Sequence, residues 1–288
     1  MKHYLYAMGA ILCWASLPAA TGSGLNGLSI NELMFFSFTA AALFLYVADA
    51  LWRKTFIPFI PSLKASLLGI WGIFLYHYIY YQAMAHAPLA EAAILATTWS
   101  FWIVVFSSLI LYRKLKGGIL LAACIGFVGA ALVISSGKNF SFQAEHMTGY
   151  GLALLCGLIW STFSVALPIM RMQGDPMPAY TIYAAILSAI LYGLSGPHTL
   201  PSVSSLASAT YLGCIPLGLS FVLWNRAVSG GNLAIIGLLS YLVPPLAVLL
   251  VAMTQKQSVS PQVLAGMTII IVASLVGKFF LGGGKRLE

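Results

Sequence analysis

Tryptophan and small hydroxyl side chains recur in matched pairs along apolar stretches of this sequence. Trp14 and Ser16 are followed 146 residues later by Trp160 and Thr162. Indole faces bind aromatic rings and cations, and a polar side chain inside an apolar segment is stable only beside a partner or an aqueous cavity. The pairs therefore predict a binding site that two similar segments share. The alternative is helix packing supported by small polar residues and interior aromatic rings.

A histidine in a tyrosine-rich stretch is the second candidate. The stretch reads Tyr-His-Tyr-Ile-Tyr-Tyr-Gln over 76–82, and His77 shares a helix face with Tyr81. A neutral imidazole could hydrogen-bond a substrate, and it could also carry a coupling proton at a pH of about 7. We include His77, Tyr78 and Tyr81 among the predicted binding residues. The alternatives are a histidine satisfied by a neighbouring helix and a belt of interfacial tyrosines.

Two later stretches supply further aromatic and polar side chains. Trp99 and Trp102 lie on adjoining faces of one apolar segment. An asparagine can both donate and accept hydrogen bonds, which suits a zwitterion. We therefore complete the predicted substrate site with Trp99, Trp102, Trp224, Asn225, Ser240 and Tyr241.

Prolines and isolated charges mark where apolar segments bend or end. Pro18, Pro168 and the pair Pro244-Pro245 should bend their helices, as hinges or as fixed kinks. Arg226 ends one apolar segment, where it either sets orientation or acts as a gate or carboxylate contact. Glu91 begins another, where a helix N-terminus stabilises a carboxylate.

The sequence lacks the patterns of common enzymes and metal sites. It holds no HExxH, GxSxG, P-loop or dinucleotide-binding glycine pattern. Its four cysteines lie singly in apolar stretches, and its six acidic residues leave few groups for acid–base chemistry. We therefore predict that the protein is not an enzyme and uses no cofactor and no metal.

The elements that position these residues are membrane-spanning helices. Hydrophobic residues make up 60% of the 288 residues and charged residues only 7%, against roughly 25% charged in soluble domains. A spanning helix needs about 20 apolar residues. That length predicts ten spans, at 4–23, 31–51, 64–85, 92–112, 117–136, 148–170, 178–195, 205–226, 233–254 and 261–281.

Basic residues orient these spans. With the N-terminus in the cytoplasm, all but Lys138 and Lys256 of the 14 basic residues fall on cytoplasmic segments. Both termini are then cytoplasmic. The net charge of +8 reflects this bias and does not indicate nucleic-acid binding, since no long basic run is present. We predict a multi-pass protein of the bacterial inner membrane, whose partners are the lipid bilayer and a small-molecule substrate. It could work as a monomer.

The chain also contains an internal repeat. Besides the match at an offset of 146, the stretch from Tyr81-Gln82 to Thr97 resembles the stretch from Trp224-Asn225 to Ser240, at an offset of 143. Five spans followed by five more give two copies of opposite orientation, an architecture common among secondary transporters. The predicted fold is all-α, with repeats at 1–137 and 148–288 joined by an outer connection at 138–147. Chance similarity of apolar segments is the alternative.

The sequence resembles the drug/metabolite transporter superfamily, in its ten-helix EamA-type branch, and most of all amino acid exporters of the YddG type. The resemblance is carried by Leu223-Trp224-Asn225, Gly231-Asn232 and Ser240-Tyr241-Leu242-Val243-Pro244, and by the stretch from Tyr76 through Glu91 to Trp99. Two features depart from the pattern. Ser100 or Phe101 stands where a proline is usual in the fourth helix, and Tyr112-Arg113-Lys114 stands where a glutamate is frequent.

The resemblance implies a basket of two five-helix halves around a central cavity, with helices 1, 3, 4, 6, 8 and 9 lining it. It implies export of amino acids or related metabolites by alternating access. Because the sequence holds no ATP-binding motif, we expect transport to run on gradients or exchange. The alternative function is export of multiple drugs or quaternary ammonium ions. The small four-helix relatives use a glutamate in the first helix for this, and here no acidic residue precedes Glu32. A cage of aromatic rings could still hold a cation.

Overall fold

A computed structural model describes residues 1–111, 113–135, 143–196, 200–255 and 259–281. These residues form helices and short connections, and none of them lies in a β-strand. Among them, eight helical segments are long and apolar enough to cross a membrane. The chain is therefore an all-helical, multi-pass membrane protein.

The first half of the chain holds helices α1 to α8. Several of them follow one another without a loop, as parts of a longer helical segment. Their bounds are α1 (Lys2–Ala15), α2 (Leu17–Leu25), α3 (Ile30–Arg53), α4 (Leu63–Gly69), η1 (Ile70–Leu75), α5 (Tyr76–His86), α6 (Leu89–Ala96), α7 (Thr98–Phe106), η2 (Ser107–Leu111) and α8 (Gly117–Ser135).

The second half repeats this order. Its elements are η3 (Ala144–His146), α9 (Met147–Ile169), α10 (Met177–Leu194), α11 (Val203–Cys214), η4 (Ile215–Leu219), α12 (Ser220–Val228), α13 (Leu233–Leu239), η5 (Ser240–Leu242), α14 (Val243–Gln255) and α15 (Pro261–Leu281).

Irregular turns fall at corresponding places in the two halves. The π-helical segment η1 interrupts the third helical segment of the first half, and the π-helical segment η4 interrupts its counterpart. The fourth segment breaks after Ala96, and its counterpart changes to a 3₁₀ turn at Ser240, just before Pro244. π-helical turns are rare and are frequently found at functional sites. Their repetition indicates that both halves share one backbone plan.

Local signals in the sequence set several helix ends. Ser29 and Glu32 form a capping box at the start of α3, in which each side chain bonds the other's backbone N–H. The side chain of Asn232 accepts hydrogen bonds from Ala234 and Ile235 at the start of α13. Lys54 and Arg171 follow the ends of α3 and α9 with positive φ angles of 54° and 45°, where a cation also meets the negative end of a helix dipole.

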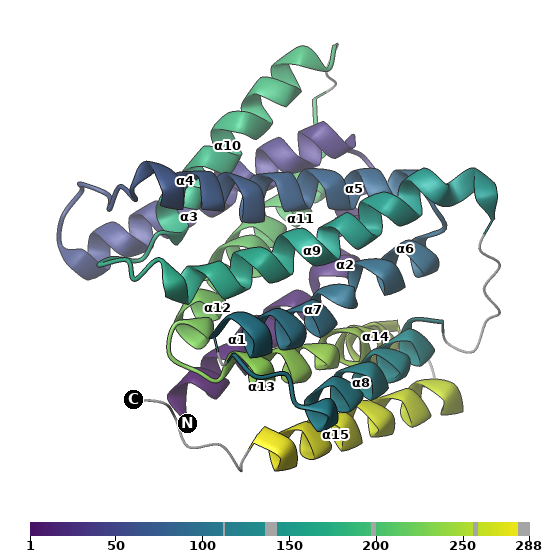
Figure 1. Cartoon of the computed structure of the whole chain (residues 1–288). Helices are drawn as coiled ribbons and strands as arrows, with labels where there is room; N and C mark the ends of the chain where they lie inside the picture. The colour runs from purple at the N-terminus through teal and green to yellow at the C-terminus, as the bar shows by residue number, and fades with distance from the viewer. Residues whose placement is uncertain (112, 136–142, 197–199, 256–258, 282–288) are drawn as a thin grey trace.

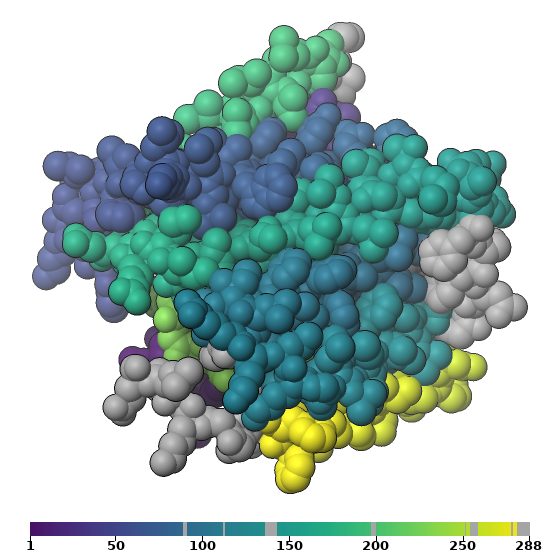
Figure 2. Space-filling view, in the orientation of Figure 1, coloured from purple at the N-terminus to yellow at the C-terminus, as the bar shows by residue number. Residues whose placement is uncertain are grey.

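Corresponding helices of the two halves lie against each other. Figure 1 shows α8 beside α15 at one edge of the molecule, and α3 beside α10 at the opposite edge. Between these edges α1 packs on α12, and α9 packs on α5. Figure 2 shows α9 and the α4–α5 segment running side by side across the surface. The centre of the molecule is therefore formed by elements of both halves.

The helices begin and end within three residues of the predicted spans. The predicted spans at 64–85 and 261–281 correspond to the helical segments Leu63–His86 and Pro261–Leu281, which are not among the eight that meet the length and hydropathy limits. Within the predicted connection at 138–147, residues 138–142 lie outside the described part of the chain.

Candidate functional site

Four tryptophans from four helices meet at the centre of the molecule. We call Trp14, Trp99, Trp160 and Trp224 the tryptophan quartet. They come from α1, α7, α9 and α12, so each half of the chain supplies two. All four side chains are buried. The sequence predicted each of them as a binding residue, and the structure brings them together.

The four indoles contact one another ring to ring. The centroid of the Trp14 ring lies 5.0 Å from that of Trp224, 5.4 Å from that of Trp160 and 6.0 Å from that of Trp99. Trp99 and Trp160 lie 5.9 and 6.2 Å from Trp224. Most of these pairs meet edge to face, which aromatic quadrupoles favour. The quartet is therefore an electron-rich aromatic cluster through which the two halves touch.

Two of the indole N–H groups are held by the opposite half of the chain or by a neighbouring helix. Trp14 Nε1 donates to the Pro216 carbonyl at 3.1 Å, within the π-helical segment η4. Trp224 Nε1 donates to Ser164 Oγ of α9 at 3.0 Å. Buried N–H groups are costly without a partner, so these bonds fix the orientation of two of the four rings.

His77 lies one ring beyond the quartet. Its side chain is buried, and its ring contacts Phe38, Tyr76 and Phe221 at centroid distances of 4.9 to 5.7 Å. Tyr76 and Phe221 in turn contact Trp160. His77 Nδ1 lies 2.7 Å from the Ile73 carbonyl. If Nδ1 carries the proton and donates there, Nε2 is an acceptor.

Ser16 and Thr162 do not join the quartet. Ser16 Oγ accepts a hydrogen bond from Tyr211 of α11 at 2.9 Å, and Thr162 Oγ1 accepts one from Trp71 Nε1 of η1 at 3.0 Å. Thr162 is exposed. Each hydroxyl therefore receives an aromatic donor from the third helical segment of the other half. The structure gives these matched residues the role of joining the halves.

The remaining predicted aromatic residues of the first half lie at different depths. Tyr81 is buried in the same core as the quartet and contacts Tyr80 at 5.8 Å. Tyr78 is half-buried and stacks on Phe74. Trp102 is half-buried, stacks on Phe106 at 5.4 Å and contacts Phe101 at 5.2 Å. Tyr78 packs against the core that contains the quartet, whereas Trp102 contacts its own helix neighbours Phe101 and Phe106.

Ser240 and Tyr241 are buried in another part of the core. The Ser240 hydroxyl donates to the Ile236 carbonyl one turn earlier, at 2.7 Å. The Tyr241 hydroxyl donates to the Ala123 carbonyl of α8 at 2.9 Å, and its ring packs against Gly126. Tyr241 belongs to the cluster that joins α8 to α15. These contacts hold the bend of the ninth helical segment.

Asn225 lies near one end of the bundle, which we call the Asp175 end. The Asn225 amide donates to Asp175 Oδ1 at 3.1 Å, and the Met177 N–H donates to the same oxygen. Burial raises the pKa of Asp175 above its ordinary value, while the Met177 N–H, the charge of Arg226 and the Asn225 amide oppose this rise. The guanidinium of Arg226 lies over the Tyr6 ring at 5.9 Å.

The opposite end, which we call the Glu91 end, is closed by different residues. The buried carboxyl group of Glu91 accepts a hydrogen bond from the Tyr150 hydroxyl of α9. Gly149 lies directly against the turn between α5 and α6, because a Cβ at Gly149 would come within 2.5 Å of Ala87 Cβ. Glu91 lies at the start of α6, as predicted, and its carboxyl group also joins the two halves through Tyr150.

Several residues of the site escaped the sequence analysis. Ser164, Pro216 and Phe221 hold or contact the tryptophans, but nothing in their types distinguishes them from other interior residues. Asp175 carried a usable signal. It is the one acidic residue between Glu145 and Glu288, and a lone carboxylate in so apolar a chain indicates a specific role.

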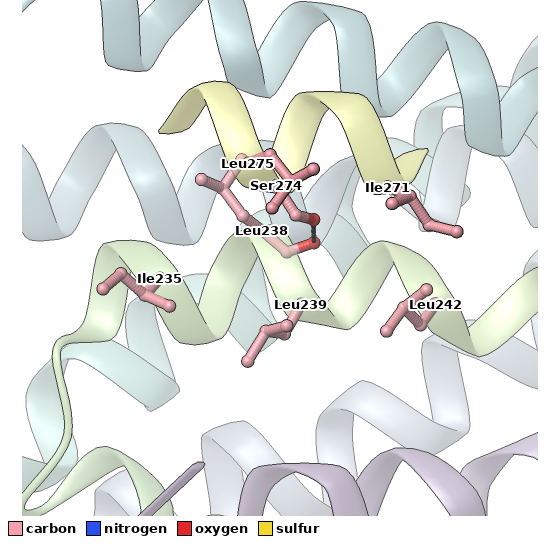
Figure 3. A pocket seen from close by; sticks show the side chains of 7 residues that line it. All are labelled: Ile235, Leu238, Leu239, Leu242, Ile271, Ser274 and Leu275. Atoms are coloured by element: carbon pink, nitrogen blue, oxygen red, sulfur yellow. Dashed lines mark hydrogen bonds between the residues drawn. The ribbon is translucent and has the colours of Figure 1, made fainter. Parts of the chain in front are cut away.

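An apolar hollow on the surface has the features of a face that lipid covers. It has a volume of about 250 Å³ and lies between α13 and α15. Figure 3 shows that all of its lining side chains except Ser274 are leucine or isoleucine. Ser274 Oγ lies 3.5 Å from the Leu238 carbonyl. Ile271 and Leu275 are more than half exposed. Among the described residues, no group of three or more His, Cys, Asp or Glu side chains could hold a metal ion.

Comparisons with known proteins agree with this architecture. The model of the EamA-like transporter family matches the chain twice, at residues 1–135 and 147–277. A solved crystal structure superposes with a TM-score of 0.89 at 28% identity, and the match covers 97% of this chain and 99% of the other.

Curated relatives are named as exporters. The aromatic amino acid exporter YddG of Ancylobacter novellus is 30% identical over 249 residues, which cover 85% of this chain and 86% of the relative. A probable terminal-alkyne amino-acid exporter of Streptantibioticus cattleyicolor is 25% identical over 87% of this chain and 84% of its own. The pseudopaline exporter CntI of Pseudomonas aeruginosa is 27% identical over 55% of this chain and 49% of its own.

Proposed function

This chain belongs to the EamA-like transporter family, and we propose that it exports amino acids with aromatic side chains, or closely related metabolites, from the cytoplasm. It is a small-molecule transporter of the inner membrane and not an enzyme. Of the relatives reported above, two are named as amino acid exporters, and the one from Ancylobacter novellus is named for aromatic amino acids.

The tryptophan quartet is the observation that carries this proposal. The four rings come from both halves and lie within 6.4 Å of one another, centroid to centroid. A substrate ring that enters between them would exchange indole–indole contacts for indole–substrate contacts of the same edge-to-face kind. Movement of one half relative to the other opens such a gap. Aromatic packing would thus couple substrate binding to the relative position of the halves.

The proposed topology has ten spans, with both termini in the cytoplasm. The eight long apolar helices are joined by Leu63–His86 and Pro261–Leu281, each of span length. In this topology the Asp175 end faces the cytoplasm and the Glu91 end faces the exterior. Rocking of the two inverted repeats would then expose the quartet to one side at a time.

Export of a quaternary ammonium ion is the second candidate function. Four indole faces could hold a cation without a carboxylate. The matched relatives named above are exporters of amino acids or of pseudopaline, and none is named for such cations. We therefore place this function second.

Counterflow separates the two. Liposomes that contain the purified protein are loaded with unlabelled L-phenylalanine, and uptake of labelled L-phenylalanine is measured with tryptophan, alanine and choline as competitors. We expect uptake that tryptophan blocks strongly, alanine weakly and choline hardly at all. Transport of choline with no uptake of any amino acid would reject the amino acid proposal.

A further inference from the structure

A polar cavity of about 260 Å³ lies at the Asp175 end, separate from the quartet. It is bounded by the end of α9, the connection to α10 and the end of α12. Its volume is slightly below the range of about 300–1,000 Å³ for ligand pockets, so it could hold one small molecule. The lining residues are Leu167, Pro168, Arg171, Met172, Gly174, Pro176, Asn225 and Ser229.

Asp175 determines which way the Asn225 amide points. Asp175 Oδ1 accepts from the Met177 N–H, and the Asn225 NH₂ group donates to the same oxygen at 3.1 Å. The Asn225 carbonyl oxygen then points the other way, and Ser229 Oγ lies 3.3 Å from it. Asn225 and Ser229 both line the cavity. The cavity wall therefore presents oxygen acceptors at this point.

Arg171 supplies the opposite charge. It lines the same cavity and is exposed. Its backbone has a φ of 45°, a left-handed conformation that is unfavourable for residues other than glycine and that clusters at functional sites. A guanidinium binds a carboxylate through two parallel hydrogen bonds. Leu167, Pro168 and Met172 form the apolar part of the wall.

We propose that this cavity is a second binding site, which holds a free amino acid at the cytoplasmic mouth before it reaches the quartet. Arg171 binds the carboxylate, the Asn225 carbonyl and the Ser229 hydroxyl accept from the ammonium group, and the apolar wall holds the side chain. Asp175 is a positioning residue that acts through Asn225. This inference rests on the proposed function, since it names how the same substrates are first bound.

The cavity shares two helices, α9 and α12, with the quartet. Asn225 is adjacent in sequence to Trp224, and Trp224 Nε1 donates to Ser164. Ser164 lies about one turn of α9 before Leu167 and Pro168, which line the cavity. A substrate that left the cavity would therefore move along α9 and α12 toward the four indoles.

Protection of a reporter thiol tests the site directly. Met172→Cys places a thiol in the apolar wall of the cavity and leaves Arg171, Asn225 and Ser229 unchanged. A membrane-impermeant thiol reagent is applied with and without L-phenylalanine. The unsubstituted chain gives the background of its four native cysteines, and Ser229→Cys is a second reporter, which also lacks the hydroxyl acceptor. We expect L-phenylalanine to slow modification, and to do so equally when Trp160→Ala disrupts the quartet.

Arg171→Ala should raise the half-protecting concentration of L-phenylalanine about tenfold, because a charge-assisted bond is lost. Arg113→Ala is the matched control, since Arg113 is also basic, exposed and at positive φ, with a φ of 50°, and it does not line the cavity. Asp175→Asn removes the carboxylate that orients the Asn225 amide, so the ammonium group of the ligand should no longer strengthen binding. In this variant, 3-phenylpropionate, which lacks the ammonium group, should protect nearly as well as L-phenylalanine.

Protection that disappears with Trp160→Ala but survives Arg171→Ala would overturn the inference, because it would come from a conformational change at the quartet. Counterflow of L-phenylalanine by the unsubstituted protein without any protection would also reject the cavity site while leaving the proposed function intact. Absence of both counterflow and protection would reject the proposed function together with the site.

Discussion

The two halves of this protein share a backbone plan but use corresponding side chains unequally. Trp14 and Trp160 occupy matching places and their rings meet at 5.4 Å. The other two members of the quartet have no tryptophan at the matching positions, where Tyr81 corresponds to Trp224 and Leu242 to Trp99. The first helical segment is broken at Ser16, whereas α9 continues to Ile169. The two halves therefore share the positions at which helices meet, whereas the side chains at those positions, and so the contacts they make, differ.

The contacts that close the two ends show the same inequality. His3 corresponds to Gly149 at the offset of 146, and Gly230 corresponds to Ala87 at the offset of 143. At the Glu91 end the glycine, Gly149, is on the helix α9, and the turn carries the methyl group of Ala87. At the Asp175 end the helix α1 carries the imidazole of His3, and the glycine, Gly230, is in the turn after α12. His3 Nδ1 also lies 2.8 Å from the Arg226 carbonyl. At each end a glycine therefore lies against a residue that has a side chain, and the glycine is on the helix at one end and on the turn at the other.

Loss of the matched tryptophans should have the largest effect. Trp14→Ala and Trp160→Ala each remove a buried indole, and burial losses of this kind cost about 3–5 kcal/mol in soluble cores. We expect either variant to lose at least about nine-tenths of L-phenylalanine counterflow, since the aromatic contacts of the proposed site are lost. Trp102→Ala is the control, because Trp102 stacks on Phe106 outside the quartet.

The comparison is sharpened by Trp14→Phe and Trp160→Phe. Both keep a ring, but only Trp14→Phe removes the donor to the Pro216 carbonyl. We expect the larger fall in counterflow and in thermal stability from Trp14→Phe. Normal counterflow in both alanine variants would show that the quartet is not the substrate site.

The exchanged glycines should give the next largest effect. A Cβ at Gly149 would meet the backbone carbon of His86 at 2.6 Å, so Gly149→Ala must displace α9 from the turn, at a cost of about 3 kcal/mol. For a Cβ at Gly230 the three nearest atoms all belong to the His3 ring. Gly230→Ala should therefore be rescued by His3→Ala, whereas Gly149→Ala should not be rescued by shortening His86.

We would measure thermal stability and counterflow of the single and double variants, to compare the rescue of Gly230→Ala with that of Gly149→Ala. If His3→Ala leaves the Gly230→Ala defect unchanged, the proposed closure of the Asp175 end by a side chain is wrong.

The hydroxyl–carboxyl contact at the Glu91 end should have an intermediate effect. Tyr150→Phe leaves the Glu91 carboxyl group, which is only 6% exposed, without one hydrogen bond, and such bonds are worth about 2 kcal/mol. Tyr6→Phe at the other end keeps the ring beneath Arg226 and should change stability little. Thermal unfolding in detergent compares the two variants. Equal falls in the unfolding temperature would show that the Tyr150–Glu91 hydrogen bond does not stabilise the Glu91 end specifically.

Much of the fold was predictable because long apolar runs have few stable alternatives in lipid. The helix bounds and the repeat followed from composition and spacing. The membership of the site was harder to predict, because it depends on how each helix is rotated. Trp99 and Trp102 are three residues apart, yet only Trp99 faces the other tryptophans. Asn225 was predicted as a binding residue, but its partner Asp175 comes from a connection that no periodicity describes.

The smallest effect is expected at Ser16 and Thr162, which the repeat pairs most clearly. Each accepts one hydrogen bond, from Tyr211 and Trp71 respectively, and a neutral bond of this kind contributes about 1 kcal/mol. Ser16→Ala and Thr162→Val should therefore lower thermal stability slightly and leave the half-saturating concentration of L-phenylalanine unchanged. The double variant should be additive, because the two bonds join different helix pairs. A selective loss of L-phenylalanine affinity in either variant would instead return that hydroxyl to the substrate site, as the sequence first predicted.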